Sequence, residues 1–245
     1  MFPIEKIQEL ERIVGPRHFS AQMMLEYVPD ERICLDPGAV IFYDNEFDSL
    51  CAKIGENRIT GVSLYWDPSS ARVSSDGSVC VLIYRDDKNR NVFVHDILYI
   101  IVQDDDLHPL ATQCGHVLSF MRKHQINGIG IEINGLGNAL PEIMRQIANK
   151  QNMPISITPI SNHTKKETRI LNTIEPVLNT GRLYMHNRIK QTILLSEMLA
   201  WTPIGSVEHD DGLDAVAGAI AMNPHSVRFG KKNNVVINAN TEFKI

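Results

Sequence analysis

The sequence lacks the features that mark several common protein classes. Its 245 residues contain no apolar run near the length of about 20 that crosses a bilayer, and Met1–Glu5 lacks the basic start of a secretion signal. Its four cysteines are far apart and form no C-x-x-C pair, which argues against a zinc site or a disulfide framework. We therefore expect a cytoplasmic protein with reduced thiols and no membrane partner.

Nucleotide-binding motifs are also missing or incomplete. No G-x-x-x-x-G-K-[ST] sequence occurs, so ATP hydrolysis by a P-loop is not expected. Gly135-Leu-Gly137 resembles the first two glycines of a dinucleotide fingerprint, but Leu140 replaces the third, and no acid ends a strand about 20 residues on. We interpret these glycines as a tight strand-to-helix turn and disfavour nucleotide binding.

The order of apolar patterns predicts an α/β domain. Residues 1–57 read as a helical appendage and linker, 58–223 as the main domain and 224–245 as a basic tail, and the chain is 43% hydrophobic, enough for a full core. Three strands in succession indicate an antiparallel meander that opens a mixed sheet, which helices flank. The strands are expected at 58–67, 78–85, 92–102, 129–133, 154–160 and 182–185, and the helices at 4–14, 18–27, 107–124, 141–150, 168–178, 190–201 and 209–222.

The first strand of the meander ends at Asp67-Pro68. Proline cannot donate a ladder hydrogen bond and favours an extended residue before it, so the strand should end there with Asp67 at its carboxyl edge. The alternative is that Asp67 only opens a turn, because Asp-Pro-Ser is ordinary turn composition.

Glu132 lies in an apolar and glycine-rich strand, Gly128-Ile-Gly-Ile-Glu-Ile133, that should be buried on both faces. A buried carboxylate costs several kcal/mol unless it is paired or bound to a metal. Glu132 is therefore expected to be a metal ligand. The alternatives are a salt bridge to an arginine or lysine elsewhere in the chain, or a side chain that emerges at the end of the strand.

A third group of acids, Asp210, Asp211 and Asp214, lies at the start of the last predicted helix. Asp210 and Asp211 suit a helix N-terminus, where they satisfy free amides and the helix dipole. Asp214 lies a turn further in, on the same face, and repels the other two unless a cation is present. His209 could add a ligand or relay a proton, although a histidine at this place is more often solvated.

Carboxylates from three separate elements suit hard cations, Mg²⁺ or Mn²⁺, and two such ions hydrolyse phosphodiesters. Basic residues gather between the second and third acidic elements, and they could hold a phosphate backbone or form a solvated helix face. Although the net charge of −5 argues mildly against nucleic acid when read globally, we expect DNA contacts at Lys165, Lys166, Arg169 and Arg182.

Five segments occur in an order that resembles the large terminase subunit of tailed bacteriophages over its C-terminal nuclease domain. The segments are Tyr65-Trp-Asp-Pro-Ser69, Ile131-Glu-Ile-Asn-Gly-Leu-Gly137, Lys166-Glu-Thr-Arg-Ile170, Gly181-Arg-Leu183 and His209-Asp-Asp-Gly-Leu-Asp-Ala215. The resemblance implies an RNase H-like fold that cuts concatemeric viral DNA with two metal ions in the host bacterial cytoplasm. Portal protein and the small terminase subunit are the partners it implies.

Carried over by position, the resemblance makes Asp67 the carboxylate that bridges both ions and Glu132 the central-strand acid. It implies that the last helix supplies Asp211 or Asp214 as a metal ligand, with Asp210 as a partner outside the ligands. It does not settle which of the three acids binds metal directly. Residues 18–27 resemble the end of the family's ATPase domain, whose Walker motifs are absent here. The alternative to a nuclease is a non-catalytic docking module of the packaging motor, or a degenerate prophage remnant.

Overall fold

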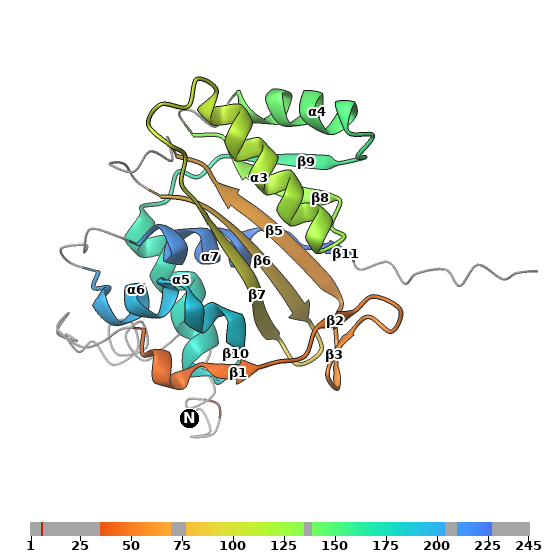
Figure 1. Ribbon diagram of the computed structural model, residues 1–245. Coiled ribbons are helices and arrows are strands. Elements are labelled where there is room, and N and C mark those ends of the chain that lie inside the picture. Colours follow the sequence, from red (N-terminus) through yellow and green to blue (C-terminus); the bar gives the residue numbers. More distant parts are fainter. Residues whose placement is uncertain (1–5, 7–34, 70–76, 135–138, 204–209, 227–245) are drawn as a thin grey trace, which may run out of the picture.

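A mixed sheet of eight strands forms the centre of the protein (Figure 1). The computed structural model describes residues 6, 35–69, 77–134, 139–203 and 210–226. Seven strands follow one another in the order β1-β10-β7-β6-β5-β8-β9, and β11 pairs with β5. The helices expected at 4–14 and 18–27 (apart from Lys6), the glycines 135 and 137, His209 and the tail from 227 lie outside the described residues.

The predicted meander is present as β5 (Gly61–Asp67), β6 (Ser78–Asp86) and β7 (Asn91–Ile100), all antiparallel. β5 begins three residues later than expected, because Asn57–Arg58 forms a separate strand, β4. β8 (Gly128–Glu132) lies parallel to β5, and β9 (Ser156–Ile160) lies parallel to β8 at the edge of the sheet. The carboxyl ends of β5 and β8 therefore lie at the same edge.

The other side of the sheet contains β10, which confirms the strand expected at 182–185, and β1, which the sequence did not predict. β10 (Leu183–His186) pairs in parallel with β7, and β1 (Ile41–Tyr43) pairs in parallel with β10. Part of the segment expected to be a linker thus belongs to the main sheet, while the division at residue 58 stays a prediction. A small antiparallel sheet consists of β2 (Phe47–Asp48), β3 (Lys53–Ile54) and β4. The short helix η1 (Pro37–Ala39) precedes β1. The strand β11 (His225–Ser226) pairs with the start of β5.

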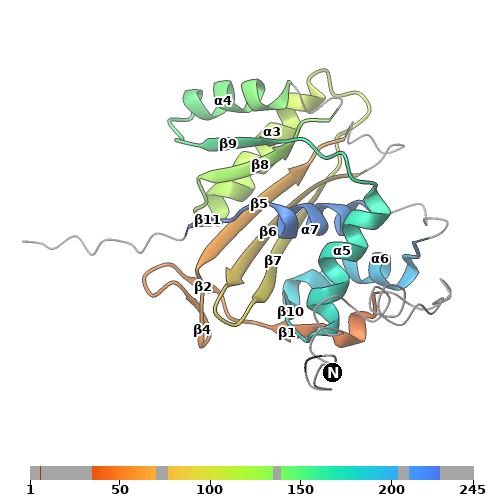
Figure 2. The same ribbon diagram turned by 180° about the vertical axis from the view of Figure 1, so that it is seen from behind.

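Helices cover both faces of the sheet (Figure 2). α3 (Pro109–Lys123) and α4 (Leu140–Lys150) pack on one face, against Trp66, and α5 (Lys166–Asn179), α6 (Leu194–Ala200) and α7 (Asp211–Ala221) pack on the other, against Tyr65. The helix expected at 190–201 is shorter, because η3 (Asn187–Gln191) precedes α6. No helix among the described residues has the length and apolar character to cross a membrane.

Charged side chains from other elements hold both ends of α7. Glu197 on α6 accepts the Leu213 amide at 3.0 Å and the Tyr99 hydroxyl at 3.3 Å. Arg85 on β6 donates to the carbonyl oxygens of Ala219 and Met222, at 2.8 and 3.1 Å, and to that of Ile220. These bonds satisfy groups that a helix leaves unpaired at its termini, so the position of α7 over the sheet is well defined.

Candidate active site

The sheet brings Asp67 and Glu132 to the same edge. Trp66 on β5 is aligned with Ile131 on β8, so the next residues, Asp67 and Glu132, end neighbouring parallel strands at the same level. Pro68 follows Asp67 and ends the strand, as its missing amide hydrogen requires. Glu132 is 8% exposed, which agrees with the expectation that its strand is buried.

α7 adds the third acid. Asp214 is 5% exposed and lies in the first turn of the helix, while Asp210 and Asp211 lie at its start. Burial, followed by the negative charges of Glu132 and Asp214, raises the pKa of Asp67 to about 8. Asp67, Glu132 and Asp214 therefore share one electrostatic environment, although they come from three elements far apart in the sequence.

Two cations from α5 pair with these acids. The Arg169 guanidinium forms a two-pronged pair with Asp214, with its Nε 2.8 Å from Oδ1, and its Nη1 lies 3.7 Å from Oε2 of Glu132. The Lys166 Nζ lies 2.5 Å from Oδ1 of Asp210 and 3.2 Å from Oδ1 of Asp211. Although burial opposes it, the hydrogen bond and charge of Asp210 raise the pKa of Lys166 above its usual value, so the lysine stays charged.

Glu132 has additional hydrogen-bond donors. Its Oε2 accepts the Tyr65 hydroxyl and, at 2.7 Å, the Asn162 amide; its Oε1 accepts the Asn134 amide at 2.9 Å. Tyr65 and Asn134 belong to the segments that carry the resemblance, but no sequence pattern assigns them a role. Their part in the site depends on the pairing of β5 with β8 and on the loop after β9.

The carboxylate of Asp67 differs from those of the other acids, because it makes no hydrogen bond or ion pair with any residue that the structure describes. It is mostly buried beside two other acids, an arrangement that is costly for a charged group and that a bound cation would relieve. The donors are all carboxylate oxygens, which hard divalent ions prefer. The donor set thus fits Mg²⁺ or Mn²⁺ in chemical type.

The present side-chain arrangement is one of ion pairs. Among the described residues, no three His, Cys, Asp or Glu side chains are placed so that they could hold a metal ion as they stand. Asp214 points to Arg169, and Asp210 and Asp211 point to Lys166. Metal binding therefore requires some of these carboxylates to exchange a cationic side chain for the ion.

The four residues expected to bind DNA lie in different environments. Lys165 is exposed directly before α5, whereas Lys166 is half-buried and paired, and Arg169 is 9% exposed and paired. Arg182 precedes Leu183, which is aligned with Val92 at the start of β7. Val92 is aligned with Arg85 on β6, and Arg85 is aligned with Gly61 on β5. Gly61 lies six residues before Asp67, and a strand rises about 3.3 Å per residue, so Arg182 lies roughly 20 Å along the sheet from the acids.

A separate group of polar residues lies on the face that α3 covers. A bulge in β7, where the register with β6 shifts between Leu82 and Ile83, turns both His95 and Asp96 toward α3. Oδ2 of Asp96 lies within hydrogen-bond distance of Nε2 of His124, at 2.8 Å. Nε2 of His95 lies 3.1 Å from Oε2 of Glu46. Burial and the nearby Arg188 charge lower the pKa of His95 to about 4, so it is neutral at pH 7.

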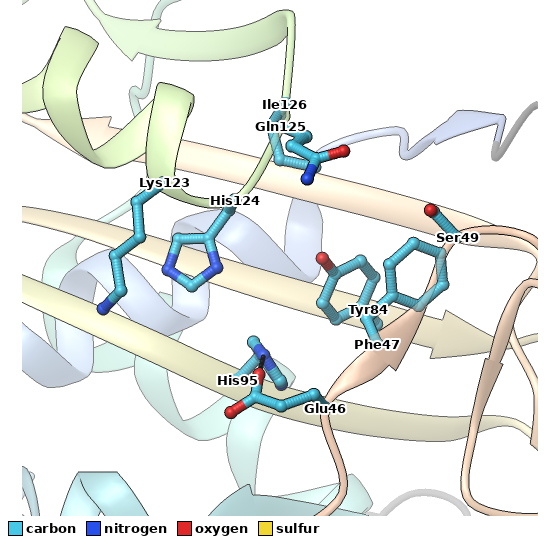
Figure 3. Close-up of a pocket in the computed structure, with 9 residues that line it drawn as sticks. All are labelled: Glu46, Phe47, Ser49, Tyr84, His95, Lys123, His124, Gln125 and Ile126. Carbon is cyan, nitrogen blue, oxygen red and sulfur yellow. Dashed lines mark hydrogen bonds and ion pairs between the residues drawn. The ribbon is translucent and has the colours of Figure 1, made fainter.

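A cavity of about 190 Å³ adjoins this group (Figure 3). It contains none of the five acids predicted to bind metal, because those lie on the opposite face or at the edge of the sheet. The cavity is therefore not the candidate active site. Its lining residues are Glu46, Phe47, Ser49, Tyr84, His95, Lys123, His124, Gln125 and Ile126.

The sheet order and the flanking helices define an RNase H-like fold, as predicted. The nuclease domain of the P22 large terminase is similar, with a TM-score of 0.53 over 76% of this chain and 89% of that chain at 15% identity. The nuclease domain of the large terminase subunit of bacterial virus Sf6, solved with manganese and beta-thujaplicinol, has a TM-score of 0.50 over 80% of this chain and 100% of that chain at 9% identity. At these identities the likeness shows the fold.

Part of the sequence also matches a known protein family. Residues 85–183 match the family described as Terminase Bacteriophage T7, Ribonuclease H-like domain. The resemblance to the RNase H-like nuclease domain of terminase large subunits is therefore confirmed. No curated protein sequence matches this chain.

Proposed function

We propose that this protein is the metal-dependent DNA endonuclease of a phage terminase, which hydrolyses phosphodiester bonds of concatemeric viral DNA during genome packaging. The observation that carries the proposal is Asp67: a carboxylate without a partner among the described residues, placed beside Glu132 and Asp214 where β5 and β8 end. The structure of the Sf6 domain with manganese supports the choice of Mg²⁺ or Mn²⁺.

Asp67, Glu132 and an acid of α7, Asp211 or Asp214, would hold two metal ions, with Asp210 outside them. The bound ions would activate the attacking water and stabilise the leaving oxygen of the phosphodiester. The side chains of the protein supply the rest of the site. Asn134 and Asn162 orient Glu132 through its two oxygens, and the fixed ends of α7 hold its acids over the sheet edge.

The basic residues of α5 would hold the DNA strand. Lys165 is exposed and free to approach a phosphate, and Lys166 and Arg169 would do so once their acids bind metal. Arg182, roughly 20 Å along the sheet from the acids, would contact the DNA further from the cleaved bond. The portal protein and the small terminase subunit are the proposed partners. We also propose that the protein acts in the host cytoplasm and that its domains divide at residues 58 and 224.

The test is cleavage of plasmid DNA with Mg²⁺ or Mn²⁺. We expect Asp67→Asn to abolish cleavage while its circular dichroism spectrum and melting temperature remain native, because asparagine keeps the shape of the side chain but cannot supply an anionic metal ligand. Asp87→Asn is the matched control, since Asp87 is exposed on the turn between β6 and β7, at the opposite end of the sheet. Full cleavage by Asp67→Asn would remove Asp67 from the mechanism.

A second candidate function is a non-catalytic module or a degenerate remnant of the packaging motor. The pairing of Asp214, Asp210 and Asp211 with Arg169 and Lys166 favours it, because these pairs neutralise the acids without a metal. This alternative predicts that titration calorimetry detects no Mn²⁺ binding by the wild-type protein. The nuclease proposal predicts saturable binding that Asp67→Asn weakens.

A further inference from the structure

Tyr65 occupies the position where the three acidic elements meet. It lies on β5 two residues before Asp67, so both side chains belong to the same face of the sheet. The side chain is 1% exposed and packs in the core that faces α5 and α7. A tyrosine buried this deeply normally has a specific partner for its hydroxyl.

The hydroxyl of Tyr65 is bonded on both sides. It donates to Oε2 of Glu132 and accepts the Asn162 amide at 2.9 Å, and the same amide donates to Oε2 of Glu132 at 2.7 Å. The Glu132 carboxylate is thereby fixed relative to β5, the strand that carries Asp67.

The ring of Tyr65 also sets the height of α7 over the sheet. A Cβ atom added at Gly218 would lie 2.4 Å from both Cε1 and Cζ of the ring and 2.8 Å from its oxygen, so the helix backbone rests directly on the tyrosine. Gly218 is four residues after Asp214, which places the two on the same face of α7. Any change in the contact between Tyr65 and Gly218 therefore moves Asp214.

We infer that Tyr65 is a positioning residue of the metal site: its hydroxyl aligns Glu132 beside Asp67, and its ring fixes the distance of Asp214 from both. The inference rests on the proposed metal-dependent function. The Tyr65 side chain contacts the acid Glu132 and would not contact the substrate. Residues that orient metal ligands typically contribute tenfold to a hundredfold in metal affinity.

Titration calorimetry with Mn²⁺ tests the hydroxyl, with the melting temperature measured in parallel. We expect Tyr65→Phe to lower Mn²⁺ affinity roughly tenfold, because Glu132 loses the orienting bond that ties it to β5. Tyr84→Phe is the matched control: Tyr84 is also 1% exposed, lies on β6 in the core of the opposite face, and has no hydroxyl hydrogen bond to a described residue. Its Mn²⁺ affinity should equal that of the wild type.

The ring contact is tested by a second pair of variants, both at glycines inside helices. Gly218→Ala should lower Mn²⁺ affinity and melting temperature, because the added methyl group forces α7 away from Tyr65. Gly115→Ala is the control on α3, where a Cβ would meet nothing within 4 Å. That variant should keep its Mn²⁺ affinity, with an equal or higher melting temperature, since alanine favours a helix over glycine.

The outcomes separate this inference from the proposed function. If the wild type binds Mn²⁺ and Tyr65→Phe binds it equally well, the positioning role is wrong and the nuclease proposal stands. Equal losses of melting temperature in Tyr65→Phe and Tyr84→Phe, without a difference in affinity, would also overturn it, because a purely structural hydroxyl behaves that way. If the wild type binds no Mn²⁺, the proposed function fails and the inference fails with it.

Discussion

Removal of the Arg169 guanidinium should destabilise the metal-free protein strongly. In Arg169→Met the side chain keeps a similar length, but Asp214 loses both prongs of its ion pair and Glu132 loses a cation at 3.7 Å. The side chains of Arg169 and Asp214 are only 9% and 7% exposed, so water replaces little of the lost interaction. A buried pair broken on one side typically costs about 3–5 kcal/mol.

The assay is thermal unfolding in EDTA, followed by circular dichroism. For a chain of 245 residues, a loss of this size corresponds to a fall of about 10 °C in melting temperature. Arg145→Met is the matched control, because Arg145 is 49% exposed and its pair with Glu142 has a distance of 3.9 Å. An exposed pair of this kind contributes about 1 kcal/mol or less, so the control should melt close to the wild type.

The double variant Arg169→Met, Asp214→Leu separates a lost interaction from general damage. Replacing both members of a buried pair by apolar groups is often neutral, so the double variant should recover most of the melting temperature. A single variant that melts within 2 °C of the wild type would refute the reasoning, because Arg169 would then not be the cation that stabilises the cluster.

Two further predictions concern the ends of α7. Burial raises the pKa of Glu197 to about 7 from 4.5, so the stability linked to its proton is complete below pH 4.5 and is lost as the pH rises through 7. In the wild type the melting temperature should therefore fall as the pH rises from about 5 to about 8, and Glu197→Gln should remove this fall. If the variant shows the same fall, another group causes the pH dependence. Arg85→Met should lower the free energy of unfolding in urea by about 2–3 kcal/mol, because three helix-end carbonyls lose their donor, and a change below 1 kcal/mol would show that water replaces it.

The sequence predicted those parts of the fold that depend on local pattern. The meander of β5, β6 and β7 follows from alternating apolar residues and short turns, and Pro68 correctly marks the end of β5. The order of strands in the sheet was beyond reach, because the pairing of β5 with β8 joins residues about 65 positions apart that share no local signal. β1 was missed for the same reason: its three residues form a strand only because β10 lies beside them.

The acids of the site were easier to find than their partners. Asp67, Glu132 and Asp214 stand out in the sequence because each is unusual in its local context, at a strand end, in an apolar strand or inside a helix. The sequence indicates Arg169 only as a DNA contact, since nothing in it shows that Arg169 pairs with an acid 45 positions away on α7. The cluster at His95 depends on a bulge in β7, which the alternation of the strand does not reveal.

Anomalous diffraction from crystals soaked in Mn²⁺ tests the central claim most directly. We predict manganese at the edge where β5 and β8 end, bound by Asp67, Glu132 and at least one of Asp211 and Asp214. The α5 cation that paired with that acid should be turned away. A soaked crystal without manganese at this edge, in which Arg169 and Lys166 still hold the acids of α7, would contradict it.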